Sequence, residues 1–387
     1  MPQIETSRNP SLADPQTLPV ASCDAANHPF YPVMFAALEK HNIRTRALDA
    51  QGEPRCGLNL TVRPADISRL GLAFAEVRKS GYRAVQTVRF SRRQYRIVFA
   101  RLVASGLETA SLEIRLEDRK RRTERFFRQN IRGNGAFLVF LGPDGVGKTT
   151  LLRQVCHALT PVFAAQEIYR WRPGRLVPTH HPARLPHSKP MRGFRRSVSY
   201  LLFSWADFVS GYLLNTRRLM GTPALVVFDR YYHDLLIDPK RYRYNGPMWL
   251  AKIIGRLVPP GDAFFLVLDA DEQAIFDRKQ QLAIDEIRRQ RTSYRQFART
   301  HGNSVVIETD NPLPQCVQRA LEAVLCHLAE KNQHLMSRWF GLSAQTASEL
   351  DLQPPRPNHI AAPPTRTPVN NPPFETTLET GTQISSY

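Results

Sequence analysis

The residues best suited to chemistry in this chain lie between Phe137 and Leu152, in the segment FLVFLGPDGVGKTTLL. An apolar strand, a Gly-x4-Gly-Lys-Thr pattern and the start of a helix follow one another, which is the setting that a phosphate-binding loop requires. Backbone N–H groups of such a loop turn towards phosphate oxygens, and the helix that follows adds the positive end of its dipole. The Lys148 side chain would reach the β- and γ-phosphates, and the Thr149 hydroxyl would hold Mg²⁺.

The predicted nucleotide-binding residues are Gly142, Pro143, Asp144, Gly145, Val146, Gly147, Lys148, Thr149 and Thr150. A plain glycine-rich turn is the alternative interpretation of this segment. The strand expected before it (136–141) and the amphipathic helix expected after it (149–158) favour nucleotide binding.

A second motif, ALVVFDR, is an apolar strand that ends in an acid at Asp229. An acid at the carboxyl edge of a sheet can orient Mg²⁺ through water, so we expect Asp229 and Thr149 at a metal site. Arg230 keeps its charge at all relevant pH values and has a planar fork that suits a phosphate. A structural salt bridge is the alternative role for Arg230.

Phosphoryl transfer needs positive charge on both sides of the moving group, so further arginines are expected from a mobile segment. The segment 277–299 is crowded with basic residues, and its lid candidates are Arg278, Lys279, Arg288, Arg289 and Arg291. Arg278 and Arg288 are the two selected for a catalytic role. The alternative is that the charged residues of this helix merely face water.

The elements around these motifs alternate between apolar strands and helices. Strands are expected at AFLVFL, QEIYRW, ALVVFD, AFFLVLD and SVVIET, and a last helix is expected over 313–331. Strands separated by helices imply right-handed crossovers and a mainly parallel sheet with helices on both faces. The predicted fold class is therefore α/β: a P-loop NTPase sheet flanked by helices, after a smaller α+β domain, with disordered N- and C-terminal tails.

The domain organisation follows from composition. We expect a disordered leader over 1–28, a small α+β domain over 29–116, a basic linker over 117–134 and the P-loop domain over 135–332. Segment 353–373 holds eight prolines, so 343–387 is expected to form a Pro-rich disordered tail.

The net charge of +19 and pI near 10.2 would suit a polyanion, although the arginines are spread along the chain. The five cysteines show no metal spacing and no disulfide framework, which favours a reducing cytoplasm. No secretory signal is visible. Segment 197–214 is the most membrane-like stretch, but Asp207 interrupts it, so a buried helix is expected rather than a membrane span.

The combination of GPDGVGKTT, DRYYHD and an Arg-rich lid resembles the thymidylate kinase family over about residues 135–331. The resemblance implies that the loop binds ATP and that Asp229 and Arg230 serve the metal and the acceptor phosphate. It also implies that Asp144 approaches the sugar of a nucleotide. Gly145 stands where one class of the family carries a catalytic arginine, which implies that the lid provides that residue.

This chain departs from the family at two places. It has Arg170-Trp171-Arg172-Pro173-Gly174 where the family usually has Arg-Glu-Pro-Gly, and the usual Ser and Tyr-Gln pair is missing from YYHDLLIDPKRYRYNGP. Trp171 could stack on a base or sugar, or could simply pack, and Arg172 could meet an acceptor phosphate.

The front domain resembles a nucleotidyltransferase-like module. Such modules hold Mg²⁺ between two aspartates spaced one apart on a strand, but the matching segment here is Cys56-Gly57-Leu58-Asn59-Leu60. Only Glu113 matches a further carboxylate. We expect this domain to be catalytically silent, with a binding or scaffolding role.

The leading hypothesis is an ATP- and Mg²⁺-dependent kinase that phosphorylates dTMP or a related nucleotide or sugar acceptor. The alternatives are an ATP-binding or ATP-hydrolysing regulatory protein without acceptor, and a P-loop kinase directed at nucleic acid, which the charge of +19 suggests. The sequence leaves the acceptor and the oligomeric state open.

Overall fold

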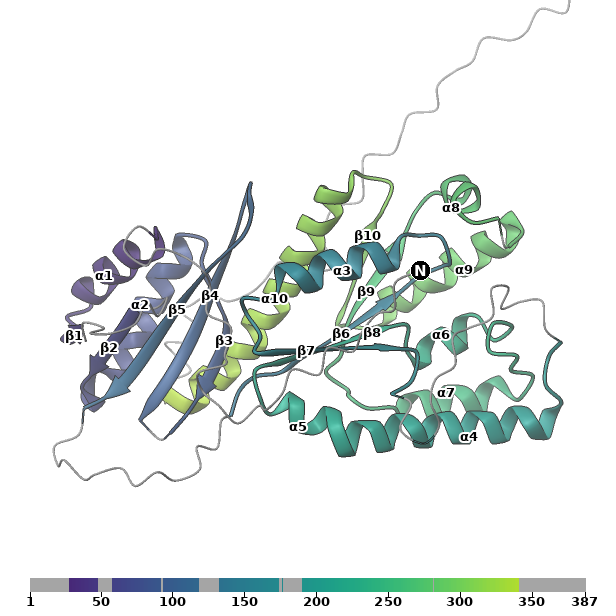
Figure 1. Ribbon diagram of the computed structural model, residues 1–387, viewed down its shortest axis with the longest axis horizontal. Helices are drawn as coiled ribbons and strands as arrows, with labels where there is room; N and C mark the ends of the chain where they lie inside the picture. Colours follow the sequence, from purple (N-terminus) through teal and green to yellow (C-terminus); the bar gives the residue numbers. More distant parts are fainter. Residues whose placement is uncertain are drawn as a thin grey trace, which may run out of the picture.

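The computed structural model describes residues 28–47, 58–91, 93–117, 132–173, 176, 190–280 and 282–340. Within these ranges the chain forms two five-stranded sheets, one in each half (Figure 1). The Pro-rich tail, Cys56, Gly57, most of the basic linker and all of the expected leader except His28 lie outside the described residues.

The first unit is a mixed sheet in the order β1-β2-β5-β4-β3, in which β2 and β5 run parallel and the other pairs are antiparallel. Helices α1 and α2 pack on one of its faces and share a core with it. Its elements are α1 (Phe30–Lys40), β1 (Thr45–Ala47), β2 (Leu58–Val62), η3 (Pro64–Asp66), α2 (Ile67–Lys79), β3 (Arg83–Arg89), β4 (Gln94–Val103) and β5 (Gly106–Leu116).

The second unit is a parallel sheet in the order β10-β9-β6-β8-β7, so the expected α/β class is confirmed. All five predicted strands are present. Its elements are β6 (Ala136–Leu141), α3 (Lys148–Ala158), β7 (Ala165–Arg170), α4 (Phe194–Gly211), the π-helical η5 (Tyr212–Thr216), α5 (Arg217–Met220), β8 (Ala224–Asp229), α6 (Tyr232–Ile237), α7 (Met248–Arg256), β9 (Phe264–Asp269), α8 (Glu272–Arg278), α9 (Ile284–Thr300), β10 (Ser304–Glu308) and α10 (Leu313–Phe340).

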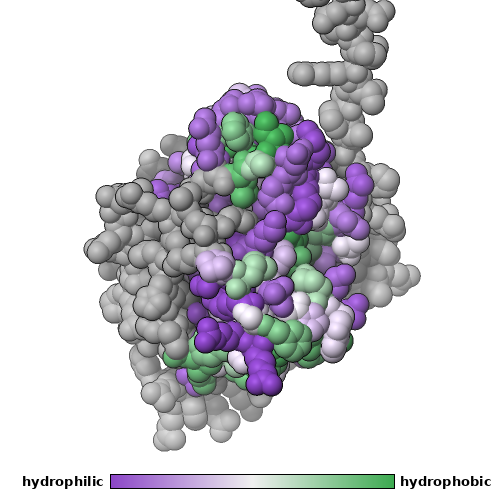
Figure 2. Space-filling model, turned by 90° about the vertical axis from the view of Figure 1, so that its right-hand side faces the viewer, coloured by the Kyte–Doolittle hydropathy of each residue, from purple (hydrophilic) through white to green (hydrophobic). Residues whose placement is uncertain are grey.

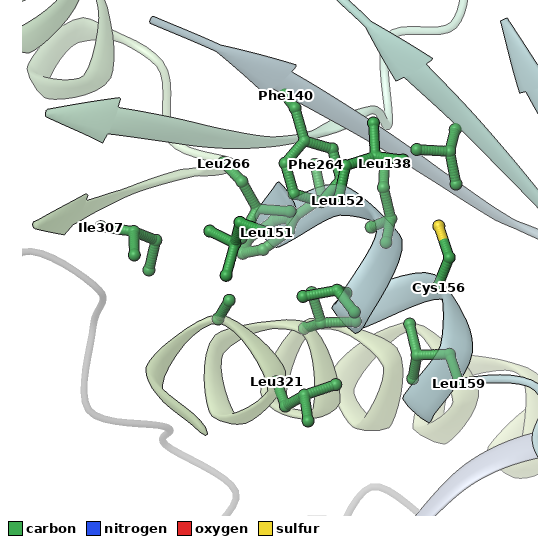
Figure 3. Close-up of a cluster of buried hydrophobic side chains, with 14 of the residues drawn as sticks. Leu138, Phe140, Leu151, Leu152, Cys156, Leu159, Phe264, Leu266, Ile307 and Leu321 are labelled. Carbon is green, nitrogen blue, oxygen red and sulfur yellow. The ribbon is translucent and has the colours of Figure 1, made fainter. Parts of the chain in front are cut away.

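Helices cover both faces of the parallel sheet. On one face, α3 and α10 bury apolar side chains against the strands, and Figure 3 shows Leu151 and Leu152 of α3, and Leu159 directly after it, among them. On the other face, α4, α6, α7 and α9 pack over a second core that is rich in aromatic residues. Strand β6 is buried along its whole length, as expected for a central strand between two helical layers.

The membrane-like segment forms α4 and η5. One face of α4 is buried at Leu201 and Phe208, as predicted, but Leu202 of α4 and Leu213 of η5 are 48% and 50% exposed. In the part of the chain that the structure describes, no helix is long and apolar enough to cross a membrane.

The last helix continues to Phe340, so the predicted end at Lys331 is wrong. Its apolar spacing continues through Met336 and Phe340, which lie in the core of the first unit. Asn332 donates a hydrogen bond from Nδ2 to the backbone oxygen of Ala84 in β3, at 2.8 Å. Helix α10 therefore belongs to both cores, and the expected boundary at residue 332 falls inside an unbroken helix.

We predict that His327 makes stability depend on pH. Its ring stacks on Phe264, and burial together with the nearby Lys331 lowers its pKa from 6.5 to about 4. Between these values the unfolded chain binds the proton and the folded chain does not, so stability is complete above pH 6.5 and falls as the pH drops towards 4. In His327→Gln, the loss of unfolding free energy between these pH values should be smaller by about 1 kcal/mol per pH unit.

Denaturant titrations across this pH range measure the slope. His334→Gln is the matched control, since His334 lies on the exposed side of the same helix. His334→Gln should keep the slope of unfolding free energy against pH that the original chain shows. If His327→Gln kept that slope too, the prediction would be wrong.

Candidate functional site

The phosphate-binding loop lies between the buried end of β6 and the first turn of α3. Gly142, Gly145 and Gly147 all have positive φ, at 145°, 91° and 94°. A Cβ on Gly142 would lie 2.6 Å from the backbone oxygen of Leu268, so strand β9 leaves no room for a side chain there. Backbone conformation favours glycine at all three positions, and at Gly142 close packing also excludes a side chain.

Lys148 points back over this loop and is 7% exposed. Its Nζ donates hydrogen bonds to the backbone oxygens of Gly142 at 2.7 Å and Pro143 at 2.5 Å. Burial and the neighbouring Arg230 guanidinium lower the pKa of Lys148 to about 7. An anion at the loop would stabilise its charged form.

Asp144 is the meeting point of the positive charges at the site. Its carboxylate accepts hydrogen bonds from the guanidinium groups of Arg230 and Arg241, and Nζ of Lys279 lies 3.8 Å away. Burial alone would raise the pKa of Asp144, but Arg230, Lys148 and Arg241 together lower it well below its usual range. Asp144 is thus a fixed negative charge surrounded by four cations, which come from the loop, the segment after β8 and the segment after β9.

Arg230 is held from behind by a second carboxylate. Its Nη1 lies 2.5 Å from Oδ2 of Asp234, which is fully buried and also accepts hydrogen bonds from the hydroxyls of Tyr242 and Tyr294. The backbone of Arg230 has φ +76°, and its N–H donates to the oxygen of Phe140 at 3.0 Å. These contacts fix the guanidinium beside the loop in a conformation that non-glycine residues rarely adopt.

Asp229 and Thr149 lie at the same edge of the sheet, at the carboxyl end of β8 and in the first turn of α3. Oδ1 of Asp229 is buried and has no hydrogen-bond partner among the described residues, while Oδ2 lies 3.9 Å from Nε of Arg170. Thr149 and Thr150 are exposed. No cluster of three acidic, His or Cys side chains occurs among the described residues. A carboxylate oxygen without a hydrogen-bond partner, at the same edge of the sheet as a threonine hydroxyl, fits a Mg²⁺ ion that takes its other ligands from phosphates and water.

Trp171 and Arg172 are engaged within the protein. The Trp171 ring stacks on Tyr242, with ring centroids 4.0 Å apart. Nη1 of Arg172 lies 3.1 Å from Oδ2 of Asp207, and both side chains are buried. The Arg172 guanidinium, expected at an acceptor phosphate, is thus directed towards α4 in this structure.

Most lid arginines are paired with acids of the lid or of the sheet edge. Arg288 lies at the surface beside Glu272 and Asp285, and Arg289 pairs with Glu286. Asp269, at the end of β9, is bound by both Arg291 and Arg295. Arg278 is exposed at the last residue of α8.

Of the residues predicted for a lid, Lys279 is the one that contacts the loop. A Cβ on Gly145 would lie 3.0 Å from the backbone oxygen of Ile275 and 3.1 Å from Cβ of Lys279, so the end of α8 packs directly on the loop. Because Gly145 has no side chain, Ile275 and Lys279 can pack directly against the backbone of the loop.

Sequence reasoning missed Arg241, Asp234 and Asp269. Arg241 and Asp234 lie in the segment that follows Asp229-Arg230, and Asp269 ends an apolar strand as Asp229 does. The ends of neighbouring parallel strands share one edge of a sheet, so the acid after LVL was the signal that could have placed Asp269 near the loop.

Comparison with protein-family models and with curated proteins gives no match. Comparison with solved structures gives 135 matching chains. One of these is the thymidylate kinase from Ehrlichia chaffeensis, with 18% sequence identity and a TM-score of 0.37 over 49% of this chain and 99% of that chain.

We predict that Asp234 is the main stabiliser of this charge cluster. Asp234→Asn would leave the buried Arg230 guanidinium without one of its two carboxylates, which should cost about 3–5 kcal/mol of unfolding free energy. Chemical denaturation measures this. Asp285→Asn is the matched control, since Asp285 is an exposed acid that pairs with Arg288, and it should change stability by less than about 0.5 kcal/mol. Equal effects of the two variants would contradict the prediction.

Proposed function

We propose that this chain is an ATP-dependent phosphotransferase that acts on dTMP or on a related nucleotide or sugar acceptor. The observation that carries the proposal is the convergence of cations on one phosphate-binding loop: Lys148 from the loop, Arg230 and Arg241 from the segment after β8, and Lys279 from the lid. Such an arrangement offers a polyphosphate positive charge from several directions, as phosphoryl transfer requires.

In this proposal the loop holds the donor. Backbone N–H groups of Gly145, Val146 and Gly147 and the amino end of α3 face the phosphates, and Lys148 exchanges its backbone contacts for phosphate oxygens. Thr149 and Asp229 would hold Mg²⁺, which shields phosphate charge and orients the transferred group. Pro143 and Thr150 complete the donor loop.

Arg230 and Asp144 are assigned to the acceptor side. Arg230 is preorganised by Asp234 and presents its positive charge beside the loop, where it can bind the acceptor phosphate. When the acceptor is a monophosphate, one of its ionised oxygens, which carries no proton, forms the bond to the γ-phosphorus while the bond from that phosphorus to the β–γ bridging oxygen breaks, and ADP leaves. Positive charges on both sides stabilise the charge that develops on the equatorial oxygens.

Arg172 remains a proposed acceptor ligand only if it leaves Asp207. For the lid, we propose that Lys279 supplies the positive charge nearest to the loop, that Arg278 beside it is the next candidate, and that Arg288 has the smallest role.

For the front unit we propose no metal-dependent chemistry. Asn59 stands opposite Glu113 in the register of β2 and β5, and Arg96 binds the Glu113 carboxylate through Nε at 3.0 Å and Nη2 at 2.5 Å. A guanidinium at this carboxylate excludes a cation from the same position by charge.

The first test is Lys148→Ala. Phosphoryl transfer from labelled ATP, screened against dTMP, other monophosphates and sugars, should fall by about 100-fold or more, because a transition-state charge contact is lost. Lys331→Ala is the matched control: Nζ of Lys331 also bonds a backbone oxygen, that of Gly135 at 3.0 Å, but far from the loop. Full activity of Lys148→Ala would overturn the proposal. ATP turnover that ignores every acceptor would favour a regulatory ATPase instead.

The second test ranks the lid cations. Lys279→Ala should lower kcat by about 10-fold or more with little change in stability, because its side chain is partly exposed and its charge faces Asp144 and the loop. Arg278→Ala should have a smaller effect, and Arg288→Ala should leave kcat within about twofold, since Arg288 pairs with acids at the surface. Steady-state kinetics with saturating ATP separates the three. An Arg288→Ala defect larger than that of Lys279→Ala would reverse the assignment.

A further inference from the structure

The largest group of exposed apolar side chains lies on α4, η5 and α7, away from the phosphate-binding loop. Seven of the thirteen exposed large hydrophobic residues in the described part of the chain are here, each 46–65% exposed. They are Phe194, Leu202, Leu213, Leu214, Trp249, Ile253 and Leu257. We call this surface the α4–α7 face.

The two helices form one side of the molecule. Leu201 and Phe208 of α4 and Ala251 and Ile254 of α7 are buried in the same core beneath the sheet. Tyr232 links the two helices, because its ring lies 6.1 Å from that of Phe208 and its hydroxyl donates to the backbone oxygen of Ala251. Both helices run along the lower side of the parallel sheet in Figure 1, so their outer faces are turned away from it.

The exposed residues follow helical spacing. Leu202, Ala206, Val209 and Leu213 recur at intervals of four, three and four residues, and none of them is buried. Trp249 and Ile253 on α7, and Leu257 directly after it, recur every four residues. Each helix thus presents a continuous apolar stripe to the outside.

Only positive charge flanks these stripes. Arg195 and Arg196 lie at one end of α4, and Arg217 and Arg218 follow η5 at the other end. Lys252 and Arg256 stand between the apolar residues of α7. All six cations are exposed, and none forms an ion pair with a described carboxylate. Asp207 is the one acidic residue of 194–220 and 248–256, and it is buried against Arg172.

The charge pattern decides between possible occupants. If a second copy packed on this face with its own α4, in either direction, arginine pairs of the two copies would lie next to each other and repel. An apolar stripe with Trp and Phe, bordered by cations and free of exposed acids, matches instead the boundary between headgroups and acyl chains of an anionic bilayer. Figure 2 shows hydrophobic surface beside strongly hydrophilic surface along the lower edge of the molecule, where α4 and α7 lie in Figure 1.

We propose that the α4–α7 face binds the surface of an anionic phospholipid membrane, with α4 and α7 lying in the plane of the interface. Leu202, Leu213, Trp249 and Ile253 enter the acyl boundary, and the six cations meet lipid phosphates. The phosphate-binding loop lies at the carboxyl edge of the sheet, not on this face, so its site stays open in the bound state.

The test is co-sedimentation of the full chain with vesicles. Vesicles that contain phosphatidylglycerol should bind the chain and release it as salt is added, whereas pure phosphatidylcholine vesicles should bind it weakly. Leu213→Ser with Trp249→Ser, and separately Arg217→Glu with Arg218→Glu, should each weaken binding by about tenfold or more. Because these side chains are exposed, circular dichroism and melting temperature should be unchanged.

Two controls make the same chemical changes elsewhere. Phe35→Ser removes an apolar side chain that is 39% exposed on α1, and Arg299→Glu reverses an exposed charge on α9; both should bind vesicles like the original chain. No binding to anionic vesicles at low salt would overturn the proposal, as would equal binding by all variants. A dimer in light scattering that Leu213→Ser with Trp249→Ser dissociates, without vesicle binding, would assign the face to a second copy.

Discussion

The buried guanidinium of Arg230 is the constraint on which the site depends. It is 5% exposed and lies between Asp144 and Asp234, so removing either acid leaves a charge in a medium that cannot solvate it. Asp234 in turn needs the hydroxyls of Tyr242 and Tyr294 to satisfy its remaining lone pairs. Helix α9 and the segment after α6 are thereby tied to the phosphate-binding loop through one cation.

This arrangement leaves the loop with an excess of positive charge directed at one place. Asp144 offsets part of the charge of Arg230, Arg241 and Lys279, yet it is a single carboxylate among several cations. A polyphosphate that binds here would replace some of the contacts between these cations and Asp144, and the cations would not have to be brought together first. These charged groups therefore hold one another in place, and the proposed phosphoryl transfer would use such preorganised charge for electrostatic stabilisation.

The sequence predicts those features of the fold and the site that depend on residues close together in the chain. The loop glycines, Lys148 and the five parallel strands could be predicted because strand, turn and helix signals lie within a few residues of each other. The partners of the charged groups could not, because Arg230 and Arg241 meet Asp144 across 86 and 97 residues. Arg172 is an example. The sequence suggests a phosphate ligand for its guanidinium, but in the structure this group pairs with Asp207, which lies 35 residues away. Strand β3 carries no clear apolar pattern, because Gln86 and Thr87 are polar although both are fully buried.

Helix α10 contributes to the hydrophobic cores of both units, so neither core is complete without it. Its first half fills the core under the parallel sheet with Leu321, Val324 and Leu328, and its second half fills the core of the first unit with Met336 and Phe340. A fragment that stopped at Lys331 would keep every strand of the parallel sheet and still uncover Tyr95, on which Phe340 packs. The front unit is thus completed by the end of a helix, more than 200 residues after its last strand, and its native core can form only after residue 340 has been made.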